Sequence, residues 1–364
     1  MEAIERVCHA REKLSHTMTP SLFARRCSEL VYDLYKPKPV LYWADFLISF
    51  GMSLISFVVF HRSACLFITI TSFIVAGLGI YRCSVFIHEI QHHPVVELRL
   101  FAQAWNAALG IPCLIPLFLY DEHSDHHSVV SYGTHKDPEY AQLRSGYLIR
   151  FISLMSLSLV YPLLGPLRFG VLTPLALTST RFNSFVYTKM SSLYNLKRGY
   201  RRRWSAQAES HTRWFQEIAC FLWVWAWIYM GLIGMIEPIF FLKTYLLFAF
   251  WMAVNQLRTL TAHRYESKGS AEDFLFQLLD TNTFDRGWAT TLWAPLGLRY
   301  HALHHLLPGL PYHNLALAHH RLMNLLPTES PYHETRRTGL INTIWQGFNS
   351  VRDGSLIQKT IKSQ

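Results

Sequence analysis

The sequence predicts an all-α integral membrane protein with two transmembrane helical hairpins, interfacial helices and a histidine-rich cytoplasmic cap. Composition gives the first reason, because 51% of the residues are hydrophobic and only 16% are charged, against about 25% charged in ordinary globular chains. Aromatic residues make up 15% of the chain, as expected where tyrosine and tryptophan anchor spans at the membrane surface. The third observation is a set of histidine clusters, some of which directly follow long apolar runs.

The formal net charge of +10 fits either a nucleic-acid partner or anionic lipid headgroups. Since the basic residues lie between apolar runs, we favour lipid headgroups and control of topology, and we expect no nucleic-acid partner. Six cysteines occur, at positions 8, 27, 65, 83, 113 and 220. None forms a C-x-x-C pair, which predicts reduced thiols and neither a zinc ribbon nor a disulfide framework.

Residues 1–40 are predicted to form a partly helical arm that ends at the Lys-Pro-Lys-Pro sequence of residues 36–39. The arm has no apolar core like that of a signal peptide, so we expect it to stay in the cytoplasm. The first hairpin follows as residues 41–60 and 66–87, each long enough to span a hydrocarbon core of about 30 Å. A turn at His61-Arg62 joins them, and the hairpin brings His88 and His92 to the cytoplasmic surface.

Two further apolar segments are interrupted. Residues 98–120 contain Asn106, Gly110, Pro112 and Pro116, which predicts a re-entrant or in-plane segment and not a straight span. Residues 147–176 contain prolines 162, 166 and 174, and we expect a broken helix that lies in the interface or dips into it.

Basic residues then determine the expected side of the membrane. Eight basic residues against one acid, Glu209, occur in residues 181–213, so the positive-inside rule places this loop in the cytoplasm. Residues 147–176 would therefore cross the membrane either not at all or twice. The second hairpin is predicted as residues 214–235 and 239–257, and it returns the chain to the cytoplasm at Arg258.

This topology predicts a multi-pass protein whose two termini and active site are cytoplasmic, in the inner membrane if the source is bacterial. We expect a membrane domain over residues 41–325 and a cytoplasmic tail over 326–364.

Histidine clusters indicate that the protein binds metal. The pattern His-x-x-His-His occurs at 123–127 and again at 301–305, and an i, i+4 pair occurs at His88 and His92. On a helix these spacings place the imidazoles on one face. His263, at the end of the second hairpin, is a further candidate. Neutral imidazole is the commonest protein metal ligand, and nine imidazoles are too many for one ion and suit two. Imidazole suits Fe, Zn, Cu or Ni, so ligand type alone does not select the metal.

These clusters resemble the three histidine boxes of the membrane fatty acid desaturases and their hydroxylase relatives. The resemblance continues through His301-Ala-Leu-His-His-Leu-Leu-Pro-Gly-Leu-Pro-Tyr-His-Asn-Leu315 and covers roughly residues 41 to 325. It implies a non-haem centre of two Fe ions, O2 as co-substrate, and an external electron donor such as a ferredoxin or a cytochrome b5. The ligands that it implies are His88, His92, His123, His126, His127, His263, His301, His304 and His305.

Other polar residues near the boxes are weaker candidates for metal ligands, for groups that orient the ligands, or for contacts to a substrate head group. Some acyl-CoA desaturases place an asparagine one helical turn before the lone histidine, but this chain has Thr259 there and Asn255 two turns back. His93 is either a further ligand or a neighbour of one. Acids near the boxes could orient imidazole N–H groups: Glu89, Asp121, Glu122, Asp125 and Asp137. Three arginines could hold a carboxylate or phosphate head group, or contact lipid: Arg258, Arg264 and Arg299.

The resemblance implies O2-dependent oxidation of a fatty acyl chain, and we expect desaturation first. Hydroxylation, or oxidative decarboxylation of a free fatty acid to a terminal alkene, is the alternative within the same machinery. A histidine-rich membrane metal transporter is a distant alternative. A transporter would carry ionisable residues inside its spans, whereas the histidines here lie at the predicted span ends.

Overall fold

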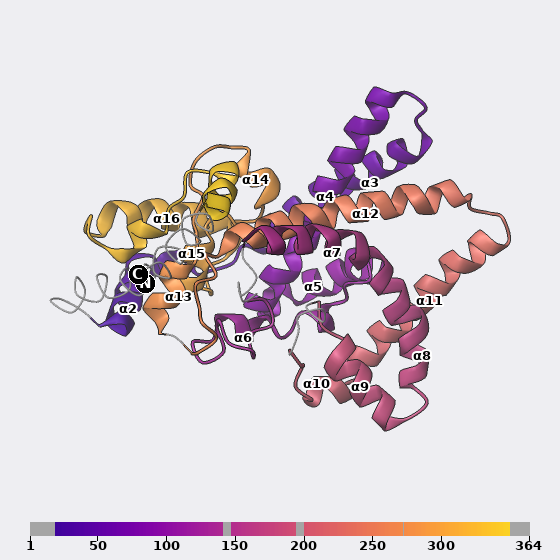
Figure 1. Cartoon of the computed structure of the whole chain (residues 1–364), viewed down its shortest axis with the longest axis horizontal. Coiled ribbons are helices and arrows are strands. Elements are labelled where there is room, and N and C mark those ends of the chain that lie inside the picture. The colour runs from indigo at the N-terminus through magenta and orange to yellow at the C-terminus, as the bar shows by residue number, and fades with distance from the viewer. Residues whose placement is uncertain (1–18, 141–146, 194–199, 272, 350–364) are drawn as a thin grey trace, which may run out of the picture.

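The structure, a computed structural model, describes residues 19–140, 147–193, 200–271 and 273–349. Within these ranges every regular element is a helix, so the predicted all-α class is confirmed (Figure 1). Five of the described helical runs are long and apolar enough to cross a membrane. They are α3 (Pro39–Arg62), α4 (Leu66–His92), the run through α7 and α8 (Tyr147–Ala176), α11 (His211–Leu232) and α12 (Pro238–Ala262). Only 22% of the apolar window of α3 is buried, so most of its surface is free to contact lipid.

The first predicted hairpin consists of α3 and α4, which pack along each other. Pro39 occupies the first turn of α3, where its missing N–H has no helical partner to lose. The predicted turn at His61-Arg62 is wrong, because α3 continues through both residues and the turn comprises residues 63–65. His88 and His92 occupy the last turns of α4.

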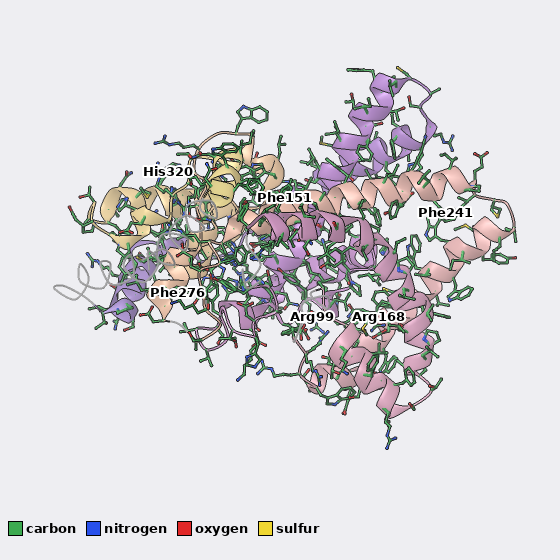
Figure 2. All side chains as sticks on the ribbon, viewed as in Figure 1. Arg99, Phe151, Arg168, Phe241, Phe276 and His320 are labelled. Atoms are coloured by element: carbon green, nitrogen blue, oxygen red, sulfur yellow. The ribbon has the colours of Figure 1, made fainter. Side chains whose placement is uncertain are left out.

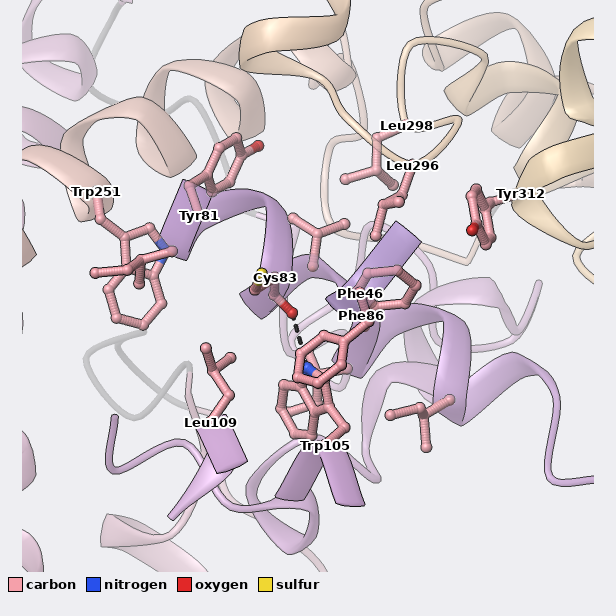
Figure 3. Close-up of a cluster of buried hydrophobic side chains, with 14 of the residues drawn as sticks. Phe46, Tyr81, Cys83, Phe86, Trp105, Leu109, Trp251, Leu296, Leu298 and Tyr312 are labelled. Atoms are coloured by element: carbon pink, nitrogen blue, oxygen red, sulfur yellow. Dashed lines mark hydrogen bonds between the residues drawn. The ribbon is translucent and has the colours of Figure 1, made fainter. Parts of the chain in front are cut away.

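An aromatic core anchors the histidine end of this hairpin. Tyr42 and Phe46 of α3 and Phe86 of α4 pack edge-on against Phe101. Beside them, Trp105 donates its indole N–H to the carbonyl of Cys83 at 2.7 Å (Figure 3). These side chains are nearly inaccessible to solvent, so the end of α4 that carries the histidines has a fixed position.

Gly77 allows α4 to approach α12 closely. A Cβ atom at Gly77 would lie 2.4 Å from the ring of Phe250, whereas a Cβ at Gly51 of α3 would meet nothing within 4 Å. We predict that Gly77→Ala lowers the free energy of unfolding by up to about 2 kcal/mol, since an overpacking cost of about 1–3 kcal/mol opposes a helix-propensity gain of about 1 kcal/mol. Gly51→Ala, the matched control, should not destabilise. Thermal unfolding in detergent measures both, and equal midpoints would contradict the close contact.

Residues 98–120 are interrupted as predicted. They form α5 (Arg99–Trp105), a π-helical turn (Asn106–Gly110) and a 3-10 turn (Leu117–Leu119), none long enough to span a membrane. The side chain of Asn106 accepts a hydrogen bond from the backbone N–H of Leu117 at 3.0 Å. This bond replaces a partner that the interrupted helix no longer supplies. The position of the segment in the membrane stays a prediction.

The predicted break within residues 147–176 is wrong. Helix α7 (Tyr147–Leu167) continues through Pro162 and Pro166 into a π-helical turn (Arg168–Leu172) and then into α8 (Thr173–Ala176). A π-turn shifts the backbone hydrogen-bond register, so the helix can bend after its prolines without ending. That this run crosses the membrane either not at all or twice stays a prediction.

Helices α11 and α12 diverge from the turn that joins them (Figure 1). Near this turn Trp227 stacks on Phe240 with ring centroids 5.4 Å apart. Further along, α12 packs against α4 and α7. The basic segment before α11 contains α9 (Thr180–Met190) and α10 (Ala206–Glu209). Its cytoplasmic location, with the α11–α12 turn on the opposite side, stays a prediction.

Most of the remaining helices gather at the end of the molecule opposite the α11–α12 turn (Figure 1). They are α2 (Pro20–Leu30), α13 (Phe274–Asp280), α14 (Thr290–Trp293), α15 (His301–Leu306) and α16 (Tyr312–Leu325). Cys27, Leu278, Leu303 and Leu322 lie in one hydrophobic core, which also buries Tyr332 of a 3-10 turn (Pro331–Thr335). Parts of the predicted arm and tail thus pack onto this cap, whose cytoplasmic location stays a prediction. The domain boundaries at residues 40 and 325 also stay predictions, and residues 1–18 and 350–364 lie outside the described ranges.

Candidate metal centre

Four places in the chain supply histidines to one region. Two lie in the last turns of α4, three in the single turn of α6 (His123–His127), three in α15, and His263 directly follows α12. Because α6 and α15 are helical, each i, i+3, i+4 set projects from one side of its helix. The structure therefore brings together all nine histidines that the sequence predicts as ligands.

The nine histidines divide into two groups, in each of which one nitrogen per ring lies within 4.8 Å of the others. The first group contains His88, His92, His123, His127 and His304, and the second contains His126, His263, His301 and His305. Helices α6 and α15 each contribute to both groups, so the groups are adjacent. The rings of His127 and His305, one from each group, stack with centroids 4.3 Å apart.

Converging imidazoles of this kind suit metal ions. In the second group the Nε2 atoms of His301 and His263 lie 2.9 Å apart, and in the first those of His304 and His92 lie 3.1 Å apart. Burial, reinforced by neighbouring imidazoles, keeps the pKa of His304 and His305 well below the ordinary value. Neutral rings are the form that binds metal. Neither ring nitrogen of buried His88 has a hydrogen-bond partner among the described residues, which is costly unless another group satisfies it.

Carboxylates contact the Nδ1 atoms of two of the rings. Nδ1 of His126 lies 2.9 Å from Asp137, and Nδ1 of His123 lies against Glu139. Asp137, one of the acids predicted to orient the imidazoles, also accepts backbone N–H groups from Gly133, Glu139 and Tyr140. Such carboxylates fix the ring tautomer, with Nδ1 protonated and Nε2 left for a metal.

This contact yields a prediction about Asp137. Asp137→Asn is expected to weaken metal binding by about 10–100-fold, because the amide orients the ring of His126 less firmly. Asp125→Asn is the matched control, since the Asp125 carboxylate pairs with exposed Arg203 at 2.7 Å. Metal titration of both variants, with metal content measured after dialysis, checks the difference. Equal affinities would show that Asp137 does not orient His126.

Glu139 was not among the acids predicted to orient the imidazoles, and two further supports were not predicted from the sequence either. The Tyr132 hydroxyl lies 2.9 Å from Nδ1 of His263 and donates to Asp280 at 2.7 Å. The side-chain amide of Gln277 lies 3.0 Å from Nδ1 of His305. Burial raises the pKa of Asp280 to about 7. Asp280 and Gln277 belong to α13, which has no spacing relation to any histidine cluster, so no local sequence pattern could have indicated them.

A cavity of about 1430 Å³ lies beside the first group and includes His88 in its wall. Its other walls come from α3, α7, α11 and α12 and are mainly aliphatic and aromatic. Along α12 the lining runs from Phe240 to Thr259, about 28 Å at the helical rise of about 1.5 Å per residue. Figure 2 shows Phe241, near one end of this lining, far from Phe276 of the cap beside the histidines. The cavity is thus long, apolar and adjacent to the candidate metal centre.

A family model described as fatty acid desaturase matches residues 63–336. The chain belongs to the fatty acid desaturase family. A ceramide hydroxylase of Caulobacter vibrioides (strain NA1000 / CB15N) is 34% identical over 346 residues, which cover 93% of this chain and 97% of that relative. The predicted family is therefore confirmed, and the chain is an oxidoreductase of lipid metabolism.

Several weaker candidates lie outside both histidine groups of this desaturase-family protein. Glu89 accepts hydrogen bonds from the Tyr42 hydroxyl and the Tyr312 backbone, so it links α4 to α3 and α16. His93 is buried next to Glu89, 3.8 Å from its carboxylate. The hydroxyl of Thr259 donates to the backbone carbonyl of Asn255 within α12.

Other acids and arginines near the boxes contact groups outside the two histidine clusters. Asp121 pairs with Arg202 at 2.6 Å, and the carboxylate of Glu122 lies 3.8 Å from the same guanidinium. Arg264 donates to the carbonyl of Glu334, and Arg299 donates to that of Phe284. Both arginines therefore hold the cap together, and neither lines the cavity. Of the three predicted head-group arginines, Arg258 lines it, as do Asn255 and Thr259.

Proposed function

We propose that the nine histidines hold two iron ions and that the protein uses O2 to hydroxylate the acyl chain of a ceramide-like lipid. The observation that carries the proposal is the position of two buried all-histidine groups beside a long apolar cavity. Neutral, buried imidazoles with unpartnered nitrogens fit a metal better than they fit a hydrogen-bonded core. The choice of iron among the metals that imidazole binds rests on membership of the desaturase family.

The cavity supports a long-chain lipid as substrate. An acyl chain can occupy the apolar lining without leaving polar groups unpaired. The same cavity carries Arg150, Asn255, Gln256 and Arg258 near the histidines. These groups offer donors and acceptors to an amide or hydroxyl head, and they give an amphiphilic lipid a polar end and an apolar end. Of the nine histidines in the two groups, His88 is the one in the cavity wall, so we expect it to face the bound chain.

Bound iron would supply the oxidising power that no side chain has, since an unactivated C–H bond must be broken. The protein's own residues orient the rings through Glu139, Asp137 and Tyr132, exclude water by burial, and position the lipid. In hydroxylation one oxygen atom of O2 enters the lipid, the other leaves as water, and two electrons with two protons come from outside. A basic cytoplasmic surface suits an acidic ferredoxin or cytochrome b5 as the donor.

Hydroxylation is favoured over desaturation by the 34% identical ceramide hydroxylase. Desaturation, the expectation from the histidine boxes alone, remains the second candidate because the same centre can remove two hydrogen atoms without adding oxygen. Oxidative decarboxylation requires a free carboxylate, and the relative's printed substrate class does not favour it.

The experiment is product analysis with the purified, iron-loaded full chain, a reducing system and isotopically labelled O2. A ceramide substrate is expected to gain one labelled oxygen atom. A product that lacks two hydrogen atoms and gains no oxygen would establish desaturation, and loss of one carbon would establish decarboxylation. Metal uptake without O2 consumption would favour a metal transporter.

A further inference from the structure

Tyr132 lies between the second histidine group and a buried carboxylate. Its hydroxyl lies 2.9 Å from Nδ1 of His263 and 2.7 Å from Oδ2 of Asp280. Tyr132 and Asp280 are each only 1% exposed. Among the tyrosines that the structure describes, Tyr132 alone has a hydroxyl that hydrogen bonds to a histidine of either group. The phenol therefore contacts a candidate metal ligand on one side and a base on the other.

The direction of these hydrogen bonds follows from the number of protons. A phenol has one proton, and here it goes to the carboxylate of Asp280, so Nδ1–H of His263 must donate to the phenol oxygen. Nε2 of His263 then carries the lone pair and faces His126 and His301 at 3.2 and 2.9 Å. Asp280 can receive a proton without leaving the site because its other oxygen is held by the backbone N–H of Glu266.

We propose that Tyr132 is a redox-active residue that reduces the oxidised centre when no lipid C–H bond is available. The inference rests on the proposed function, because the oxidant is the di-iron centre after reaction with O2. Tyr132 gives one electron to that centre, its O–H bond breaks, and the proton forms an O–H bond on Asp280. The products are a neutral tyrosyl radical and a neutral carboxylic acid. One electron from the external donor, with the proton returning from Asp280, restores both groups.

Burial makes this pair suitable for such a step. Loss of the electron together with the proton creates no additional buried charge, whereas a phenol cation or an unpaired carboxylate would be costly there. The ring of Tyr140 contacts that of Tyr132 with centroids 5.0 Å apart, and Tyr265 contacts Tyr140 at 5.1 Å. These aromatic rings surround the phenol and keep water away from a radical. By giving up an electron, Tyr132 would spare the histidine ligands from oxidation in futile turnover.

The test mixes the reduced, iron-loaded full chain with O2 in the absence of lipid and freezes the sample for electron paramagnetic resonance. We expect an organic radical that Tyr132→Phe removes and that the matched variant Tyr265→Phe, which removes a hydroxyl that donates to the carbonyl of Thr259, retains. Fluorotyrosine incorporated at position 132 keeps the hydroxyl and should change the hyperfine pattern. Asp280→Asn, which removes the proton acceptor, should lower the yield of the radical at least several-fold.

Iron content is measured in every variant, so that a structural effect on His263 is recognised as loss of metal. If Tyr132→Phe loses iron, the fluorotyrosine sample decides, because it preserves both hydrogen bonds. The proposal is overturned if no radical forms, if the fluorotyrosine leaves the hyperfine pattern unchanged, or if Asp280→Asn leaves the yield unchanged. A lipid that gains oxygen while no tyrosyl radical forms would reject this inference and leave the proposed function standing. A lipid that gains no oxygen would reject the proposed function.

Discussion

Replacing His126 or His304 with alanine is expected to abolish lipid oxidation and to lower the bound iron to about half. Each side chain supplies one nitrogen to a different group, His304 to the first and His126 to the second. Truncation leaves an opening in a buried site whose remaining rings cannot rearrange freely, since His126 is also held by Asp137 and faces His263 at 3.2 Å. Product yield and iron per chain, measured on the same preparation, test both consequences.

His320→Ala is the matched control because it makes the same chemical change on the same cap. His320 lies on the exposed face of α16 (Figure 2), outside both groups. This variant should keep normal iron content and turnover. Full turnover in His126→Ala or His304→Ala would remove that histidine from the ligand set, whereas equal losses in all three variants would indicate general damage to the cap.

A second large effect is expected from Glu217, which lies in α11 away from the histidines. Its carboxylate accepts two hydrogen bonds from Arg168, at 2.6 and 2.9 Å, and one from Thr173 at 2.7 Å. Arg213, on the preceding turn of α11, lies 3.5 Å away. All of these groups are buried. Glu217→Ala would leave two guanidinium groups without their shared counter-charge, which costs about 3–5 kcal/mol when such a pair is buried.

Glu29→Ala provides the comparison. Glu29 also pairs with an arginine, Arg25, but the two side chains are 52% and 76% exposed, and exposed pairs contribute about 0–1 kcal/mol. Thermal unfolding in detergent should therefore show a large drop for Glu217→Ala and little change for Glu29→Ala. Similar midpoints for both variants would mean that the network around Glu217 does not connect α11 to the α7–α8 run as the structure shows.

Local spacing explains which features could be predicted from the sequence. The three-histidine sets at 123–127 and 301–305 need only one helical turn each to align their rings, and the pair at His88 and His92 needs only that α4 stay helical. Asp137 lies in the loop that directly follows the second set, so its proximity could also be anticipated. Gln277 and Asp280 could not, because α13 reaches this region only through its packing against α15. The role of Tyr132 could not either, because its partner His263 lies 131 residues further along the chain.

Proline and arginine were less informative than their usual interpretations suggest. Pro162 and Pro166 predict a break, yet the π-helical turn at Arg168–Leu172 lets the helix continue. Arg264 and Arg299 lie close to histidines in sequence, but backbone carbonyls of the cap accept their hydrogen bonds. Arg258 differs because the last turns of α12 turn it toward the cavity. Which partner an arginine meets depends on tertiary packing, which a single sequence does not display.

The central claim is that two iron ions occupy the two histidine groups, and Mössbauer spectroscopy combined with iron analysis tests it most directly. The purified chain should contain two iron ions per chain, one for each group, as high-spin iron in nitrogen-rich environments that changes on exposure to O2. A chain that binds a single redox-inert ion such as zinc, or iron that O2 leaves unchanged, would contradict the account.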